Sequence, residues 1–143
     1  MVISNFRKDV EAFFSKQEKQ ISLFNAVEKM INSIGPVTME VKKSVISIGT
    51  NIKFAWVWMP QPWSSERPED CLVLTFGVGR YIENDKIVEA KEPYPGRWIH
   101  HVIIQVKDDL TDDVYQWLRE AYTFSQNRTE NHHSAQDAEA RET

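Results

Sequence analysis

The spacing of apolar residues, which changes twice along the 143-residue chain, constrains the fold most strongly. Up to Ile34 apolar residues recur every three or four positions, which is typical of amphipathic helices. From Val37 the apolar residues fall into short runs, several of which alternate with a period of two, as in strands. After Thr111 the helical spacing returns. This order predicts a single α+β domain with a mostly antiparallel sheet and helices covering one side.

Capping signals give the expected ends of the helices. Ser4 or Asn5 can cap a first helix, and Ser15 to Glu18 reads as a capping box that starts a second one. Gly35-Pro36 is expected to end that helix, because Gly accepts a left-handed cap and Pro cannot continue the ladder. Thr111 is expected to cap a final helix. The chain therefore has two N-terminal helices and one C-terminal helix.

The region between the helices is expected to form the sheet, with about five strands. The expected strands are Val37–Val41, Ser44–Ile48, Phe54–Met59, Leu72–Val78 and Trp98–Val106, with a hairpin over Tyr81–Ala90. Strand alternation puts Phe54, Trp56 and Trp58 on one face, which the helices are expected to cover. Residues 1–124 form the predicted domain. Residues 125–143 have little to bury, and we expect a disordered polar tail.

Composition narrows the classes of function. The chain is 41% hydrophobic and 27% charged, with no apolar run near the ~18 residues that span a bilayer and no secretory leader, so we expect a cytoplasmic protein without membrane contact. Its net charge of −4 makes non-specific binding to nucleic acid unlikely without excluding a local basic patch. The single cysteine, Cys71, excludes an internal disulfide and a thiolate-rich zinc site, and is expected in the core.

The residues with most chemistry lie in the stretch from Pro93 to Val106, which contains Arg97 and the pair His100-His101. Neighbouring residues of a regular strand point to opposite faces, so the two imidazoles should separate, one of them toward the helices. The simplest interpretation makes one a satisfied core residue and the other an exposed strand residue. The alternative places one of them at the rim of a ligand pocket.

A ligand site follows if the ends of several strands converge. Its candidate residues are Lys43, Trp58, Arg80, Arg97, His100 and His101. Arginine can hold a carboxylate or phosphate through a planar fork, and a tryptophan face can stack a planar ligand. The alternative is that Arg80 and Arg97 form ion pairs with Glu83, Glu89 or Glu92 that merely hold loops in place. We assign no catalytic residue, no metal ligand and no cofactor.

Acidic residues offer a further alternative. Asp70, Glu89 and Lys91 match the sparse Asp and Glu-x-Lys pattern of metal-dependent nucleases. The acidic run from Asp108 to Asp113 could hold a hard cation weakly, but helix capping explains it better.

Several separated motifs, in order, resemble the bacterial family of domains of unknown function called DUF5655. The similarity covers roughly Phe6 to Phe124 and is carried by Lys43-Ser44, Phe54–Trp58, Leu72–Gly77, Glu92–His101 and Trp117–Tyr122. The resemblance implies no established activity. It implies a domain that occurs alone or appended to nuclease-like or predicted transport-associated proteins, and that is similar to a wider group including proposed iron chaperones.

Taken together, these observations favour binding over catalysis. We expect a binding or adaptor module with a pocket for a small anionic or planar ligand. A nucleic-acid-associated accessory domain is the first alternative, and a metal-dependent hydrolase or nuclease, or a metal chaperone, is the second. The sequence leaves the oligomeric state open.

Overall fold

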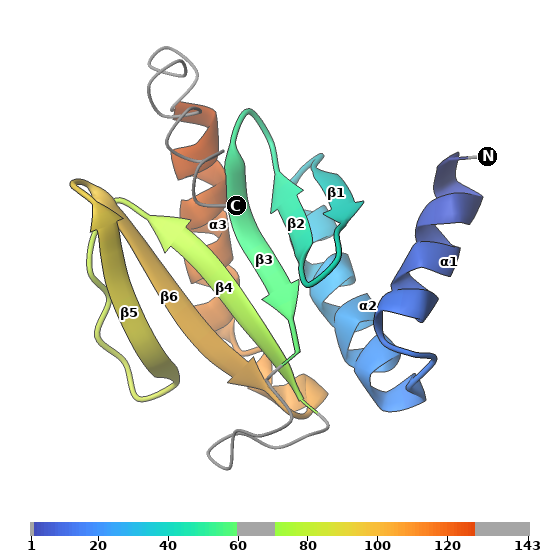
Figure 1. Ribbon diagram of the computed structural model, residues 1–143. Helices are drawn as coiled ribbons and strands as arrows, with labels where there is room; N and C mark the ends of the chain where they lie inside the picture. The colour runs from blue at the N-terminus through green and yellow to red at the C-terminus, as the bar shows by residue number, and fades with distance from the viewer. Residues whose placement is uncertain (1, 60–70, 128–143) are drawn as a thin grey trace.

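A computed structural model describes residues 2–59 and 71–127 of the chain, with side chains from Phe6 onward (Figure 1). The helices are α1 (Val2–Phe13), α2 (Glu18–Ile34), the 3-10 turn η1 (Lys107–Asp109) and α3 (Asp112–Asn127). The strands are β1 (Thr38–Val41), β2 (Ile46–Gly49), β3 (Lys53–Trp58), β4 (Leu72–Val78), β5 (Ile87–Tyr94) and β6 (Arg97–Ile104).

The strands form one antiparallel sheet in the order β1-β2-β3-β4-β6-β5. The only departure from sequential order is the exchange of β5 and β6, which puts β6 beside the central β4 and leaves β5 at the edge. The predicted α+β class with an antiparallel sheet is confirmed. The sheet has one strand more than the sequence indicated, because the segment read as a hairpin contributes a full edge strand.

Two helices cover one face of the sheet. In Figure 1, α2 and α3 lie behind the sheet, and the face turned toward the viewer carries no helix among the described residues. We call this second surface the front face. Helix α1 packs against α2 beside the β1 edge, where the ring centroids of Phe14 and Phe24 are 5.9 Å apart. The main hydrophobic core lies between the sheet and the helices, with Phe76 of β4 stacked on Trp117 of α3 at 5.7 Å.

The junction between α1 and α2 differs from the prediction. Ser15 and Lys16 have positive φ angles of 52° and 61°, so they form a left-handed turn after α1. Helix α2 begins at Glu18, and its N-cap Gln17 makes no side-chain capping bond. The predicted capping box is therefore wrong, because Ser15 belongs to the turn that reverses the chain.

The segment Tyr81–Ala90 is not a hairpin. Residues before Ile87 are not in a strand, and Asn84 organises a turn by accepting the backbone N–H of Lys86 on its Oδ1 at 3.0 Å. The true hairpin joins β5 and β6 through Gly96, whose φ of +81° suits a residue without a side chain. The Pro-x-Pro-Gly sequence thus closes a hairpin at the sheet edge.

A bulge between β2 and β3 changes the parity of the aromatic run. Gly49 pairs with Lys53 while Ile48 pairs with Ala55, so one extra residue is accommodated in β3. Phe54 consequently packs on the helix side, with its ring 5.8 Å from that of Tyr122 in α3. Trp56 and Trp58 lie on the front face. The prediction that all three rings share one face under the helices is wrong.

Helix α3 starts as the sequence predicted and ends later. Thr111 Oγ1 accepts the backbone N–H of Val114 at 3.3 Å, which confirms the expected cap. The helix continues to Asn127, past the predicted domain boundary at Phe124, and Ser125 is buried. Residues 60–70 and 128–143, which hold the predicted loop and most of the predicted tail, lie outside the described residues. No helix in the described ranges has the length and apolar character needed to cross a bilayer.

Candidate functional site

A single line of directly paired residues crosses all six strands on the front face. Each consecutive pair in it is a register partner in the sheet, and partners in antiparallel strands share a face. Its members, which we call the polar row, are Glu40 (β1), Ser47 (β2), Trp56 (β3), Thr75 (β4), His101 (β6) and Glu89 (β5). Every member can form a side-chain hydrogen bond.

The interior of the polar row is buried. The exposed fractions are 0% for Ser47, 4% for Thr75 and 8% for Trp56, and 17% for the His101 side chain. Burying a hydroxyl without a partner costs about 1–3 kcal/mol. Among the described residues the Ser47 hydroxyl has no hydrogen-bond partner. Packing of the sheet alone would favour apolar residues at these positions, so the polar row is the candidate site.

A chain of hydrogen bonds fixes the middle of the polar row. Trp58 leans over the row from the next front-face position of β3, and its Nε1–H donates to Thr75 Oγ1 at 2.8 Å. Thr75 Oγ1 lies 2.7 Å from His101 Nδ1. The Trp58 and His101 rings also meet edge to face at 5.7 Å. The imidazole is thereby held on two sides.

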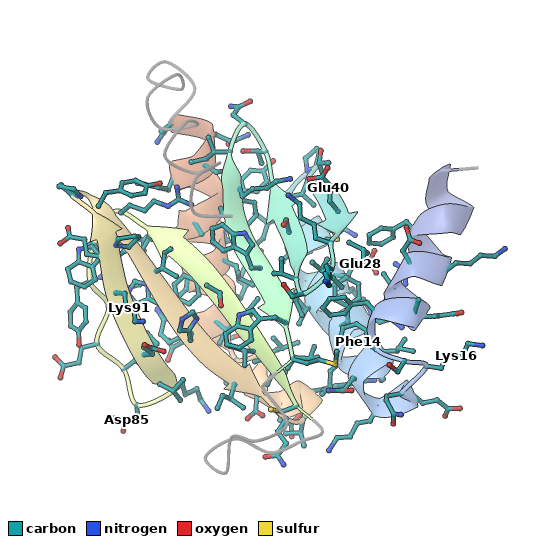
Figure 2. The ribbon with its side chains drawn as sticks, viewed as in Figure 1. Phe14, Lys16, Glu28, Glu40, Asp85 and Lys91 are labelled. Carbon is teal, nitrogen blue, oxygen red and sulfur yellow. The ribbon has the colours of Figure 1, made fainter. Side chains whose placement is uncertain are left out.

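Both ends of the polar row carry a carboxylate beside a lysine. Glu40 Oε1 is 2.5 Å from Lys53 Nζ, and the hydrogen bond and charge of this lysine lower the pKa of Glu40. At the other end Glu89 Oε2 is 3.1 Å from Lys91 Nζ, and Glu89 Oε1 is 3.8 Å from His101 Nε2. Figure 2 shows Glu40 and Lys91 near the opposite edges of the sheet. No excess positive charge therefore lies along the described row.

Arg97 is a buried structural residue beside the polar row. It is 1% exposed, and it donates from Nη1 to Tyr94 Oη at 3.0 Å and from Nη2 to the Lys53 carbonyl at 2.8 Å. Its guanidinium carbon lies 5.8 Å from the Trp56 ring centroid. A Cβ on Gly77 would stand 3.0 Å from Arg97 Nε, so this glycine makes room for the guanidinium.

His100 belongs to the core, where the simpler interpretation placed one member of the pair, but its buried Nδ1 has no hydrogen-bond partner among the described residues. Its ring stacks on Phe76 at 5.0 Å, and its Nε2 accepts the backbone N–H of Ile82 at 3.0 Å. Burial lowers the pKa of His100 from 6.5 to about 4, so the imidazole is neutral at pH 7. The predicted separation of His100 and His101 onto opposite faces is confirmed.

The six residues predicted to share one pocket do not converge. Lys43 is exposed in the β1–β2 turn, which lies at the end of the sheet where β3 finishes, whereas Arg80 follows β4 at the opposite end. Arg80 forms a two-pronged pair with Glu120 of α3, at 2.9 and 3.0 Å, instead of with the glutamates considered from the sequence. Only Trp58 and His101 lie together, with Arg97 nearby through Trp56. The convergent pocket is therefore a wrong prediction, because antiparallel connections send these strand ends apart.

The acidic alternatives gain no support from the described residues. No group of three or more His, Cys, Asp or Glu in residues 2–59 and 71–127 could hold a metal ion. Glu89 and Lys91 pair with each other, and Asp70 lies outside the described residues. Asp109 Oδ2 accepts the backbone N–H groups of Gln105 and Val106 at 2.8 and 3.0 Å, so it closes a turn. Cys71 is buried, as expected.

The sequence did not identify Ser47 or Thr75 as candidate site residues, and it suggested an arginine or a metal ion, instead of His101, as the partner of Glu89. The alternation of side chains along a strand predicts which neighbours share a face with Thr75 in β4 and with His101 in β6. It does not predict the contact between the two residues, because that contact depends on β4 lying beside β6. Glu89 meets His101 only because β5 pairs on the outer side of β6. These contacts can therefore be predicted only when the order of the strands in the sheet is known.

A family model described as a domain of unknown function, DUF5655, matches residues 10–125 of the 143-residue chain. The chain belongs to the DUF5655 family. The match spans the sheet, all of α2, most of α3 and the C-terminal end of α1, so the polar row lies wholly within the DUF5655 domain. No curated protein and no solved structure matches the chain. The family description assigns no activity, so function has to be argued from the site.

Proposed function

We propose that this DUF5655 domain is a binding module for a small planar, polar ligand held on the polar row. The proposal is carried by the observation that Ser47, Thr75 and His101 are polar, largely buried and aligned on the front face, which no helix of residues 2–59 and 71–127 covers. Ligand sites combine aromatic walls with a few placed polar groups, and Trp56 and Trp58 supply such walls here.

The charges of the row favour a neutral planar ligand over the anionic one considered from the sequence. Glu40 and Glu89 each lie against a lysine, and Arg80 and Arg97 have protein partners. A phosphate or carboxylate would approach the Glu89 carboxylate, whose charge already balances that of Lys91. A neutral planar ligand with ring N–H or amino donors would instead find an acceptor in the Ser47 hydroxyl, the register partner of Trp56.

The test is a titration of the full chain with small probes, observed by the indole N–H resonances in ¹H–¹⁵N spectra. The Trp58 resonance is assigned with Trp58→Phe. Adenine, cytosine and nicotinamide serve as neutral planar probes, and inorganic phosphate and acetate as anionic ones. We expect a saturable shift of the Trp58 resonance with at least one planar probe and none with the anions. Absence of any saturable shift at millimolar planar probe would refute the proposal, and a shift with phosphate alone would favour the anionic ligand.

Ser47→Ala separates binding from stability. Because the Ser47 hydroxyl has no partner among the described residues, its removal should leave the free energy of unfolding unchanged or slightly higher. Loss of one hydrogen bond to the ligand should weaken binding by about tenfold. Thr123→Val, an exposed position of α3 away from the front face, is the matched control and should change neither quantity.

A further inference from the structure

The hydrogen-bond donors along the polar row determine which acceptor receives the hydroxyl proton of Thr75. An indole N–H can only donate, so Trp58 Nε1–H occupies one lone pair of Thr75 Oγ1 at 2.8 Å. The Thr75 hydroxyl hydrogen is then directed at His101 Nδ1, 2.7 Å away. This distance lies within the range required of a nucleophile and its base.

The carboxylate at the far side of the imidazole supports the same assignment. Glu89 Oε1 lies 3.8 Å from His101 Nε2, which is an ion-pair distance and longer than a hydrogen bond. A negative charge on that side favours a proton on Nε2, and it favours the imidazolium when Nδ1 also takes a proton. His101 Nδ1 is therefore the acceptor in the resting state. The order carboxylate, imidazole, hydroxyl is the one that activates an alcohol for attack.

We infer that Thr75, His101 and Glu89 form an acyl-transfer site on the polar row, with the Thr75 hydroxyl as nucleophile and a small planar acyl ester as substrate. The inference rests on the proposed function, because the ester has to bind beside Trp56 and Trp58 before it reacts. It adds a chemical reaction to a site otherwise proposed to bind only.

The proposed reaction consumes only the ester and one water molecule. Thr75 Oγ1 attacks the carbonyl carbon of the ester while its proton passes to His101 Nδ1. The bond to the leaving oxygen breaks, and the proton on Nδ1 goes to that oxygen, which leaves as the alcohol. Water then attacks the threonine ester, gives one proton to Nδ1 and releases the carboxylic acid, and the Nδ1 proton returns to Oγ1. Glu89 stabilises the imidazolium in both halves.

Trp58 controls access to the nucleophile. Thr75 is 4% exposed, and the Trp58 indole, which is partly exposed, makes the contact to Oγ1. Because Thr75 is so little exposed, we expect the Trp58 ring to move aside when a planar substrate reaches Oγ1. Because an N–H donor withdraws electron density from the oxygen, its displacement leaves Oγ1 more nucleophilic when substrate is present.

The experiment measures acylation of the full chain by p-nitrophenyl acetate. Release of p-nitrophenolate gives the rate, and peptide mapping after acid quenching gives the acylated residue. Treatment with alkaline hydroxylamine removes an ester on threonine and leaves lysine amides intact. We expect an acetyl ester on Thr75, its absence in Thr75→Val, and acylation at least about tenfold slower in Glu89→Gln and His101→Asn. Thr123→Val should react like the unaltered chain.

Lack of an ester on Thr75 in the unaltered chain would overturn the inference, as would an unchanged rate of Thr75 acylation in Glu89→Gln. Glu89 is partly exposed at the sheet edge, so this variant keeps the test decisive if Thr75→Val fails to fold. The planar probes above separate the two proposals. Saturable binding without acylation refutes the acyl-transfer site and leaves the binding module, whereas absence of both refutes both.

Discussion

Protonation of His100 should control how the stability of the domain depends on pH. The imidazole is 0% exposed, stacks on Phe76 and accepts the Ile82 N–H through Nε2. Burial lowers its pKa from 6.5 to about 4. Below pH 6.5 the unfolded chain therefore binds a proton that the folded chain does not accept until near pH 4. Stability that is complete above pH 6.5 is lost as the pH falls toward 4.

The size of this effect follows from the two pKa values. Between pH 7.5 and pH 5 the loss amounts to about 2 kcal/mol, since one pKa unit corresponds to ~1.4 kcal/mol. His100→Gln is the matched variant, because its Oε1 can replace Nε2 as the acceptor for Ile82 and it does not titrate. Urea unfolding followed by circular dichroism at both pH values gives the free energies.

The carboxylates titrate in both proteins, so the difference between the two losses of unfolding free energy reports on His100 alone. We expect the unaltered chain to lose about 2 kcal/mol more than His100→Gln on moving from pH 7.5 to pH 5. Equal losses in the two proteins would show that the buried imidazole is not held neutral, and the reasoning would fail.

Four further substitutions test the packing of the domain, each by urea unfolding at pH 7.5. Arg80→Ala removes an exposed ion pair with Glu120 and should lower the free energy of unfolding by at most about 1 kcal/mol. Arg97→Lys loses the buried hydrogen bonds of the guanidinium and should lower it by at least about 2 kcal/mol. Similar losses in the two variants would contradict the structural assignment of Arg97. Gly77→Ala places a Cβ 3.0 Å from Arg97 Nε and should cost about 1–3 kcal/mol, and no loss would mean that the guanidinium moves freely. Thr111→Ala removes the α3 cap and should cost about 1 kcal/mol, so an unchanged stability would count against this cap.

The sequence predicted those parts of the fold that depend on neighbours along the chain. Apolar periodicity located the helices and most strands, and Thr111 was recognised as a cap because its partner is only three residues away. The separation of His100 and His101 followed from strand geometry alone. Errors arose where distant segments decide the conformation. Ser15 resembled a cap but lies in a left-handed turn, and Phe54 changes face through a bulge set by pairing with β2.

The site could be predicted only in part for the same reason. Trp58 and His101 were among the candidates because their residue types suggested chemistry, but the group they contact in common, Thr75, has no distinctive sequence context. It becomes significant when β6 lies beside β4 and β5 lies beside β6. The order of the strands depends on pairing between segments that are far apart in the sequence. The periodicity of apolar residues contains no information about that pairing.

The stretch from Pro93 to Val106 serves two purposes that its sequence does not separate. Its first part is structural, since Gly96 closes the β5–β6 hairpin and Arg97 ties that hairpin to the Lys53 carbonyl of β3. His100 then fills the core, and only His101 faces the polar row. Arg97 nevertheless bears on the site, because its guanidinium packs on the ring of Trp56, a member of the row. The buried arginine thus packs against an aromatic wall of the proposed ligand site.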